Sequence, residues 1–89
     1  MVTVYLYGEI RKRVGSRVIN VNAEGKRLID LLKELSKQYN LADLIFRGGK
    51  VRSELIILVN GSDWNSLGYL NRKLSNNSII KIVPIWHGG

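Results

Sequence analysis

The sequence predicts an α+β domain, in which one long helix packs across one face of a mixed sheet of four to five strands. Residues 2–7, 17–22, 55–59 and 79–86 have the alternating or continuous apolar pattern of strands. Residues 28–39 instead have the 3.6-residue period of an amphipathic helix. Because only one such helical segment is long, the sequence predicts a single helical layer against the sheet.

The first two strands are predicted to pair as a hairpin. The even-numbered residues from 2 to 6 are apolar and face one side, whereas Tyr5 and Tyr7 face the other. Residues 9–16 form a polar, basic connection, and alternation resumes at residues 17–22. We therefore expect two neighbouring strands joined by a loop.

The helix is predicted from its apolar spacing. Asn22 or Glu24 is expected to cap its start, and Asn40 is expected to stop it. Polar and charged side chains occupy the face opposite to the apolar one. The apolar face is expected to lie in the core and consists of Leu28, Ile29, Leu31, Leu32, Leu35 and Tyr39.

The middle of the chain contains one strand and several turns. Residues 41–46 are expected to form a short helical turn or a packed loop, and Gly48-Gly49 a sharp turn. The continuous apolar run at 55–59 predicts a strand inside the sheet. Asn60-Gly61 is a strong turn signal, and Trp64 is expected to fill the core.

The last strand follows a turn predicted at residues 75–78. Ile80 and Ile82 share the face expected in the core, and Lys81 lies on the opposite face. Three apolar residues on the Lys81 side are expected to stay partly exposed: Ile79, Val83 and Ile85. Pro84 cannot donate a ladder hydrogen bond, so the pairing is expected to weaken there and the tail to leave the sheet.

Composition limits the classes of function. Eighty-nine residues predict one domain, and 45% hydrophobic residues indicate a globular one. The absence of cysteine excludes disulfides and thiolate chemistry on this chain. The net charge of +7, with the outward Tyr5 and Tyr7, leaves open a basic RNA-binding module. The basic residues are scattered, however, which favours an ordinary solvated surface.

No segment of the sequence predicts export or insertion into a membrane. The N-terminus lacks a basic leader, and the longest apolar run is far too short to span a bilayer. We therefore expect a cytoplasmic location and no membrane partner. His87 is the only histidine, and there is no spacing of metal ligands, so no metal site is predicted.

The sequence ends in His87-Gly88-Gly89 directly after the last strand. Glycines have no side chain, so they can enter a slot that excludes other residues. The terminal carboxylate is sterically bare but needs activation before a nucleophile can attack it. We divide the chain into a domain at residues 1–86 and a flexible C-terminal tail at 87–89. A chance ending remains the alternative to a reactive one, because short motifs often have no function.

The order of elements and the ending resemble the β-grasp, or ubiquitin-like, fold. Residues 59–68 follow the hydrophobic-Asn-x-x-Asp-Trp-x-x-Leu-Gly pattern of the ubiquitin-related modifier family, and the tail resembles its Leu-His-Gly-Gly ending. Val51-Arg52 and Leu74 also fit that family. Trp86 stands where the family tends to have Leu. Pro84 is instead similar to the proline-containing tail of the small subunit of molybdopterin synthase.

The resemblance implies a sulfur carrier and protein modifier that is not an enzyme. An adenylating enzyme of the ubiquitin-activating type would use ATP and Mg²⁺ to activate Gly89, and a persulfide on that enzyme or on a sulfurtransferase would convert it to a thiocarboxylate. A tRNA-thiolating enzyme would then use the sulfur for 2-thiolation of a wobble uridine. In some members the activated terminus also acylates lysines. No cofactor is expected on the chain itself.

The resemblance also implies roles for the residues near the tail. Gly88 would supply reach and narrowness, and His87 is either a contact in the activating enzyme's channel or a spacer. The partner-docking surface is expected to comprise an exposed Trp86 with Ile85, Val83 and Ile79. Two alternatives stay open: the small sulfur-carrying subunit that serves a pterin-binding synthase partner, and the RNA-binding module.

Overall fold

The computed structural model describes residues 1–86, so the predicted tail at 87–89 lies outside the described residues. Within residues 1–86, no helix combines the length and the apolar character that crossing a membrane requires. The elements follow in this order: β1 (Val2–Leu6), α1 (Gly8–Val14), β2 (Val18–Val21), α2 (Leu28–Tyr39), α3 (Ala42–Ile45), β3 (Phe46–Arg47), β4 (Lys50–Val51), β5 (Leu55–Val59), β6 (Ser62–Asp63) and β7 (Ile79–Pro84).

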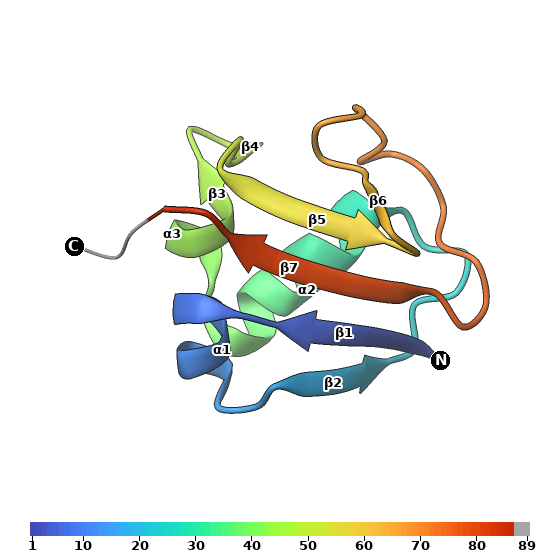
Figure 1. Cartoon of the computed structure of the whole chain (residues 1–89), viewed down its shortest axis with the longest axis horizontal. Coiled ribbons are helices and arrows are strands. Elements are labelled where there is room, and N and C mark those ends of the chain that lie inside the picture. Colours follow the sequence, from blue (N-terminus) through green and yellow to red (C-terminus); the bar gives the residue numbers. More distant parts are fainter. Residues whose placement is uncertain (87–89) are drawn as a thin grey trace.

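The main sheet has five strands in the order β2-β1-β7-β5-β6 (Figure 1). β1 pairs with β7 in parallel, and the other neighbours are antiparallel, so the predicted mixed sheet is confirmed. The last strand of the chain therefore lies in the middle of the sheet. β3 and β4 form a separate two-stranded sheet.

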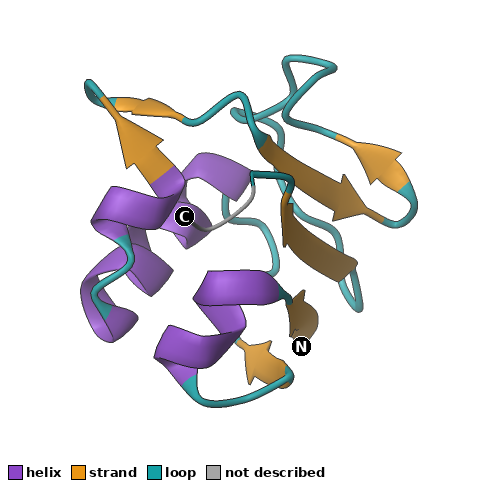
Figure 2. Cartoon of the chain, turned by 60° about the vertical axis from the view of Figure 1, so that its left-hand side comes forward, coloured by secondary structure: helices purple, strands orange, loops and turns teal. Residues whose placement is uncertain are grey.

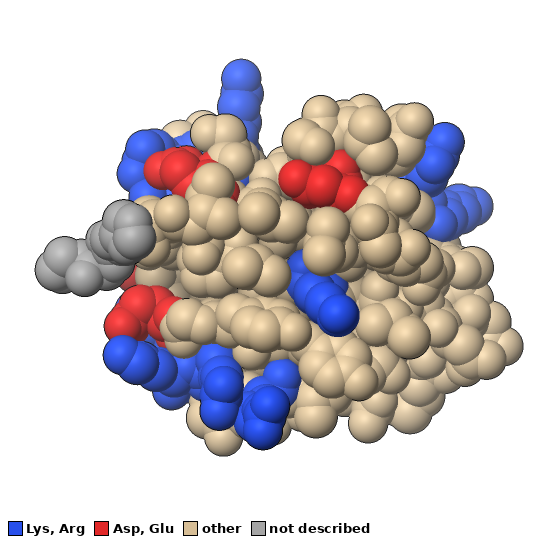
Figure 3. Space-filling model, in the orientation of Figure 1, with Lys and Arg blue, Asp and Glu red and all other residues tan. Residues whose placement is uncertain are grey.

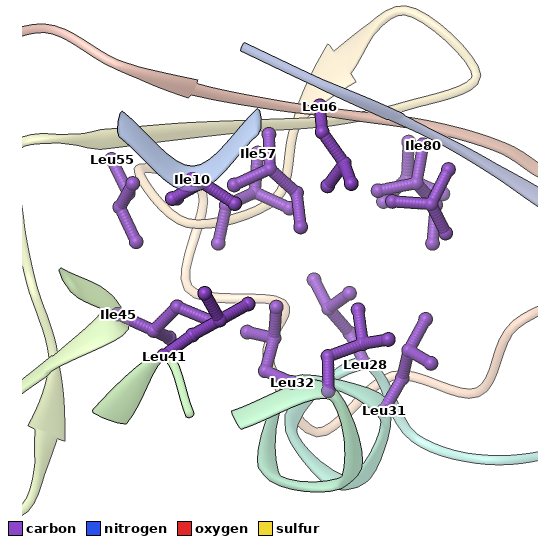
Figure 4. Packing of buried hydrophobic residues seen from close by; sticks show 14 of the residues in the cluster. Leu6, Ile10, Leu28, Leu31, Leu32, Leu41, Ile45, Leu55, Ile57 and Ile80 are labelled. Carbon is purple, nitrogen blue, oxygen red and sulfur yellow. The ribbon is translucent and has the colours of Figure 1, made fainter. Parts of the chain in front are cut away.

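The core lies between the inner face of the sheet and α2. Figure 4 shows Leu6, Ile57 and Ile80 from the sheet facing Leu28 and Leu32 from the helix. All of these side chains are at most 2% exposed. Burial of such side chains stabilises a fold by about 1.5–3 kcal/mol each, before the loss of chain entropy is counted. The helices gather on one side of the main sheet (Figure 2), which confirms the α+β layout.

The expectation of one long helix is wrong, because the described residues contain three helices. The predicted loop after β1 begins instead with α1, which ends at Gly15 in the left-handed conformation. Only Ile10 and Val14 give this segment an apolar stripe, which is too little for the periodicity to reveal. Ile10 is completely buried and packs into the core, so tertiary contact rather than local preference stabilises α1. The short helical turn predicted near residue 44 is confirmed as α3.

The predicted cap of α2 is also wrong. The N-cap is Arg27, and no side chain caps the helix. The N–H groups of Leu28 and Ile29 instead donate to the carbonyl oxygens of Arg72 and Leu70, at 3.0 and 2.8 Å. The loop before β7 thus satisfies backbone donors that a side-chain cap would otherwise serve. The predicted stop is confirmed, since Asn40 closes α2 in the left-handed conformation (φ 57°).

The predicted turns are confirmed. Asn60 and Gly61 have positive φ angles of 49° and 91° and join β5 to β6, as a tight hairpin turn requires. The Asn60 side chain also accepts a hydrogen bond from the backbone N–H of Ile79 at 2.8 Å. This turn therefore holds the first residue of β7. The run at 55–59 lies inside the sheet, between β7 and β6.

The expectation that pairing weakens at Pro84 is confirmed only in part, because β7 ends at Pro84 but its pairing with β5 includes that residue. Pro84 pairs with Leu55, and the N–H of Ile85 still donates to the carbonyl oxygen of Glu54 at 3.1 Å. Successive N–H groups of a strand point to opposite sides. The nitrogen of Pro84 therefore points toward β1, whose pairing with β7 has already ended at Leu6. No ladder hydrogen bond is lost at this proline.

Gly8 has no room for a side chain. Its φ is 60°, and an added Cβ would lie 2.8 Å from Cγ of Pro84. We predict that Gly8→Ala lowers the free energy of unfolding by about 1–2 kcal/mol from the left-handed backbone and by a further 1–3 kcal/mol, roughly, from the contact. Urea unfolding measures this loss. Gly15→Ala is the control, because Gly15 also has positive φ but open space around it. Equal losses in the two variants would contradict the proposed contact.

Candidate functional site

The described part of the site is the place where β7 ends and the chain continues to His87. His87, Gly88 and Gly89 lie outside the described residues, so their predicted roles remain predictions. The expectation of an exposed Trp86 is wrong. Trp86 is half-buried against the core, and the guanidinium carbon of Arg52 lies 4.4 Å from the centre of its ring. Trp86 is therefore a packed residue at the base of the tail.

Arg52 is held in place by several groups. Its side chain is only 15% exposed. One terminal nitrogen donates to the carbonyl oxygen of Asp43 at 3.1 Å, and the other donates to Oε2 of Glu54 at 3.2 Å. A fixed, partly desolvated guanidinium over an indole ring gives a favourable cation–π contact of about 0.5–2 kcal/mol. This contact restrains the indole ring just before the tail.

Glu54 contacts both Arg52 and the chain next to Trp86. Its carbonyl oxygen accepts the N–H of Ile85, while its carboxylate accepts Arg52. We call Arg52, Glu54 and Trp86 the tail clamp. On the other side of the last strand is a hollow of about 220 Å³, lined by Gly8, Glu9, Lys12, Pro84 and Trp86. Trp86, the last described residue, thus contacts Arg52 of the tail clamp on one side and lines this hollow on the other.

The predicted docking residues do not form one compact patch. Ile79 and Ile85 are 47% and 56% exposed, whereas Val83 is half-buried. Ile79 and Ile85 stand six positions apart on an extended chain, which separates them by roughly 20 Å. Lys81 lies between them on the same face. The outward residues of β7 therefore form a line along the strand.

Sequence reasoning missed two residues that widen this line. Ile56 pairs with Val83, and Leu58 pairs with Lys81, so both lie on the outer face and are partly exposed. The continuous apolar run of β5 conceals its alternation between buried and partly exposed positions. Only the pairing register with β7 reveals which residues face outward. We call Ile56, Leu58 and Val83 the outer strip. Figure 3 views this face of the sheet, whose middle carries few charged side chains.

The pKa of Glu54 is lowered in the folded protein. Hydrogen bonding from its own backbone N–H is the largest cause that lowers this pKa below 4.5, and the hydrogen bond from Arg52 is the second. The pKa of Asp43 is lowered as well, chiefly by hydrogen bonding from Arg13. Both carboxylates are thus favoured in their ionised form at neutral pH. Among residues 1–86, no three side chains of the metal-binding types lie close enough together to hold an ion.

Comparison with known proteins assigns the chain to a family. The profile described as ThiS family matches residues 4–89. The chain belongs to the ThiS family. This assignment confirms the resemblance to ubiquitin-like sulfur carriers and modifiers. Members of this kind are small carrier proteins and not enzymes, which confirms the prediction for this ThiS-family chain.

Individual relatives agree with the ThiS assignment. The ubiquitin-related modifier 1 homolog of Drosophila grimshawi is 32% identical over an alignment of 87 residues, which covers 94% of this chain and 80% of that protein. The crystal structure of Urm1 from Sulfolobus solfataricus is 32% identical with a TM-score of 0.72, covering 93% of this chain and 99% of that one. The small archaeal modifier protein 1 of Methanosarcina acetivorans is 28% identical with a TM-score of 0.82, covering 99% and 95%. These neighbours confirm the predicted β-grasp fold.

Loss of Arg52 should release Trp86. We predict that Arg52→Ala lowers the free energy of unfolding by about 0.5–2 kcal/mol and moves the Trp86 indole N–H resonance toward that of a solvated indole. Arg52→Lys should shift the resonance too, because lysine lacks the planar group. Arg47→Gln is the control, since Arg47 lies 3.6 Å from the same Glu54 carboxylate but is 67% exposed. An unchanged indole resonance in Arg52→Ala would contradict the tail clamp.

Glu54 should contribute stability that depends on pH. A carboxyl group whose pKa is lowered by folding stabilises the fold above its unfolded pKa, and this contribution is lost as pH falls through the folded pKa. We therefore predict that wild-type stability exceeds that of Glu54→Gln at pH 7, and that the difference shrinks below the ordinary value of 4.5. Urea midpoints measured across this range at low salt test the prediction. A difference that stays constant down to pH 3, about one and a half units below that ordinary value, would rule out the ionised carboxylate as its source.

Proposed function

We propose that this protein carries sulfur on the carboxyl group of Gly89. The observation that supports the proposal most is the ThiS-family match, which extends to residue 89 and so includes Gly88-Gly89. The structure adds a physical basis, because β7 is paired on both sides and Trp86 is clamped. A firmly held last strand would present the following residues to a partner in a defined direction.

The chemistry requires an activating partner. An oxygen of the Gly89 carboxylate attacks the α-phosphorus of ATP, pyrophosphate leaves, and an acyl-adenylate forms with Mg²⁺ bound by the partner. A persulfide of the partner or of a sulfurtransferase attacks the acyl carbon, and AMP leaves. A second thiolate then attacks the distal disulfide sulfur, which leaves a thiocarboxylate on Gly89 and a disulfide on the partners. The chain has no cysteine, so every thiol in these steps belongs to partners.

The tail and the outer strip would contact different parts of the activating enzyme. Gly88 and Gly89 suit a narrow channel, because they lack side chains. The outer strip, with exposed Ile85 beside it, offers an apolar surface near the end of β7. Apolar residues of this kind favour contact with a partner protein. We propose that the activating enzyme docks on the outer strip and receives the tail, with His87 contacting its channel.

We propose the 2-thiolation of a tRNA wobble uridine as the fate of the sulfur. Relatives over most of this chain are named ubiquitin-related modifiers, a name that also supports the attachment of Gly89 to lysines of other proteins. Pro84 motivated the alternative of a molybdopterin synthase subunit. Its packing over Gly8 now gives that proline a structural reason of its own. The proposed site of this work is the cytoplasm, where ATP and tRNA are present.

Formation of the thiocarboxylate can be measured by intact-mass spectrometry. After incubation with the activating enzyme of the same organism, ATP, Mg²⁺ and a sulfide source, we predict a mass gain of about 16 Da, as oxygen is exchanged for sulfur. A variant with one alanine appended after Gly89 should keep its unfolding midpoint but show no gain. An equal gain in the extended variant would refute the role of Gly89.

The acceptor is tested in cells that lack the gene. Loss of 2-thiouridine from bulk tRNA, restored by the wild-type chain and not by the extended variant, would support tRNA as the acceptor. Loss of molybdopterin with normal tRNA thiolation would support the pterin alternative instead and overturn the tRNA proposal.

A further inference from the structure

A second hollow lies beside the end of β1 and the start of β2. It measures about 260 Å³ and is lined by Tyr5, Leu6, Tyr7, Arg11, Arg17 and Val18. We call it the tyrosine hollow. Ligand pockets for whole small molecules occupy about 300–1,000 Å³, so this hollow is smaller than a typical cofactor site. No residue of the outer strip lines it.

Two aromatic rings of the tyrosine hollow are accessible. Tyr5 and Tyr7 are each 37% exposed; Tyr5 lies on the outer side of β1, and Tyr7 follows the end of that strand as the N-cap of α1. Tyr5 pairs across the sheet with Val18 on one side and with Lys81 on the other. The Tyr5 ring is thus mounted on a strand whose backbone is paired on both edges, and Tyr7 follows directly after that strand. Aromatic side chains on a rigid strand can stack against bases without a large entropic cost.

The charge around these rings is positive and uncompensated. Every acidic residue of the chain is engaged within residues 1–86: six form ion pairs with other groups, and Asp63 accepts backbone N–H groups. Arg11, Arg17 and Lys81 take part in none of these pairs. Lys81 lies 5.9 Å from the centre of the Tyr5 ring. Figure 3 shows basic side chains gathered at the lower left, in the region of α1 and the segment leading to β2.

In another basic and aromatic cluster, the rings are already in contact with a cation of the protein. Near the loop before β7, the guanidinium of Arg72 lies 3.8 Å from the centre of the Tyr69 ring and 5.7 Å from that of Trp64. The two rings also meet edge to face at 6.1 Å. Those aromatic faces are already covered by the protein. In the tyrosine hollow, by contrast, Tyr5 and Tyr7 are each 37% exposed, and Arg11 and Arg17 take part in none of the ion pairs among residues 1–86.

We infer that the tyrosine hollow binds a single-stranded segment of RNA. One or two bases stack on Tyr5 and Tyr7, while Arg11, Arg17 and Lys81 contact the phosphates. An acidic protein would use the charges but would gain little from two neighbouring open rings, whereas every base has a face that can stack. Tyr7 directly precedes Gly8, which lines the hollow beside the tail, so the bound RNA would lie close to where the chain leaves the fold. This site adds to the proposed function and does not depend on tRNA being the sulfur acceptor.

Charge variants test the phosphate contacts. The probe is a fluorescein-labelled single-stranded RNA of about 12 nucleotides, within the usual range for such sites, and binding is followed by fluorescence anisotropy at several salt concentrations. We predict that Arg11→Gln with Arg17→Gln weakens binding at least fivefold and reduces the slope of log K against log salt by about 0.7 for each lost contact. Lys33→Gln with Lys37→Gln is the matched control. It removes the same charge from the exposed side of α2 and should leave the slope nearly unchanged. Equal effects of the two pairs would overturn the site.

Ring variants test stacking. Tyr5→Val keeps a strand-forming residue, and Tyr7→Thr keeps a good residue at the start of α1, so both variants should fold. Each should weaken RNA binding about 5- to 100-fold, as loss of one stacked base predicts. Unchanged binding in both folded variants, or competition by polyglutamate as effective as by unlabelled RNA, would overturn the inference in favour of an acidic protein partner. The RNA site and the sulfur proposal can fail separately, so the mass gain on Gly89 is measured in the same variants. If the wild type gains mass normally but binds no RNA, only the RNA site is rejected. If it binds RNA but gains no mass, only the sulfur proposal is rejected.

Discussion

The parallel pairing of β1 with β7 is the constraint on which the rest of the structure depends. It brings the first and the last strand of the chain together in the interior of one sheet, with β5 on the other side of β7. The strand that leads to the tail therefore has partners on both edges, and its inward residues Ile80 and Ile82 are completely buried. Such a strand opens only when the whole domain unfolds. We therefore expect β7 to stay paired when a partner binds the residues that follow it.

The same strand separates the two surfaces for which we propose different partners. Its outer side, with β5, forms the apolar outer strip, while the far edge of β1 borders the tyrosine hollow. Lys81 stands between them, paired with Leu58 on one side and with Tyr5 on the other. A protein partner on the outer strip and an RNA in the hollow would therefore be neighbours. The carrier would hold both close to the end of β7.

Much of the fold could be predicted from the sequence, because its long elements have strong local signals. The strands, the helix at 28–39 and the turn at Asn60-Gly61 depend on patterns within a few residues. α1 could not be predicted, since Ile10 is apolar for a reason that lies in the distant core. The cap of α2 was mispredicted because carbonyl groups from residues 70 and 72, far along the chain, replace it.

The candidate site also contains features that the local sequence predicts and features that depend on distant residues. The role proposed for Gly89 is a prediction that depends on the ending and on family resemblance. The packing of Trp86 could not be predicted, because its partner Arg52 stands 34 positions earlier and meets it only in the folded state. The clamp has a geometric consequence for any enzyme that uses this protein. Gly89 is three residues beyond Trp86, and three extended residues span at most about 10–11 Å. An enzyme must therefore bring its reacting centre within that depth of the domain surface, and a deeper catalytic channel would exclude this carrier.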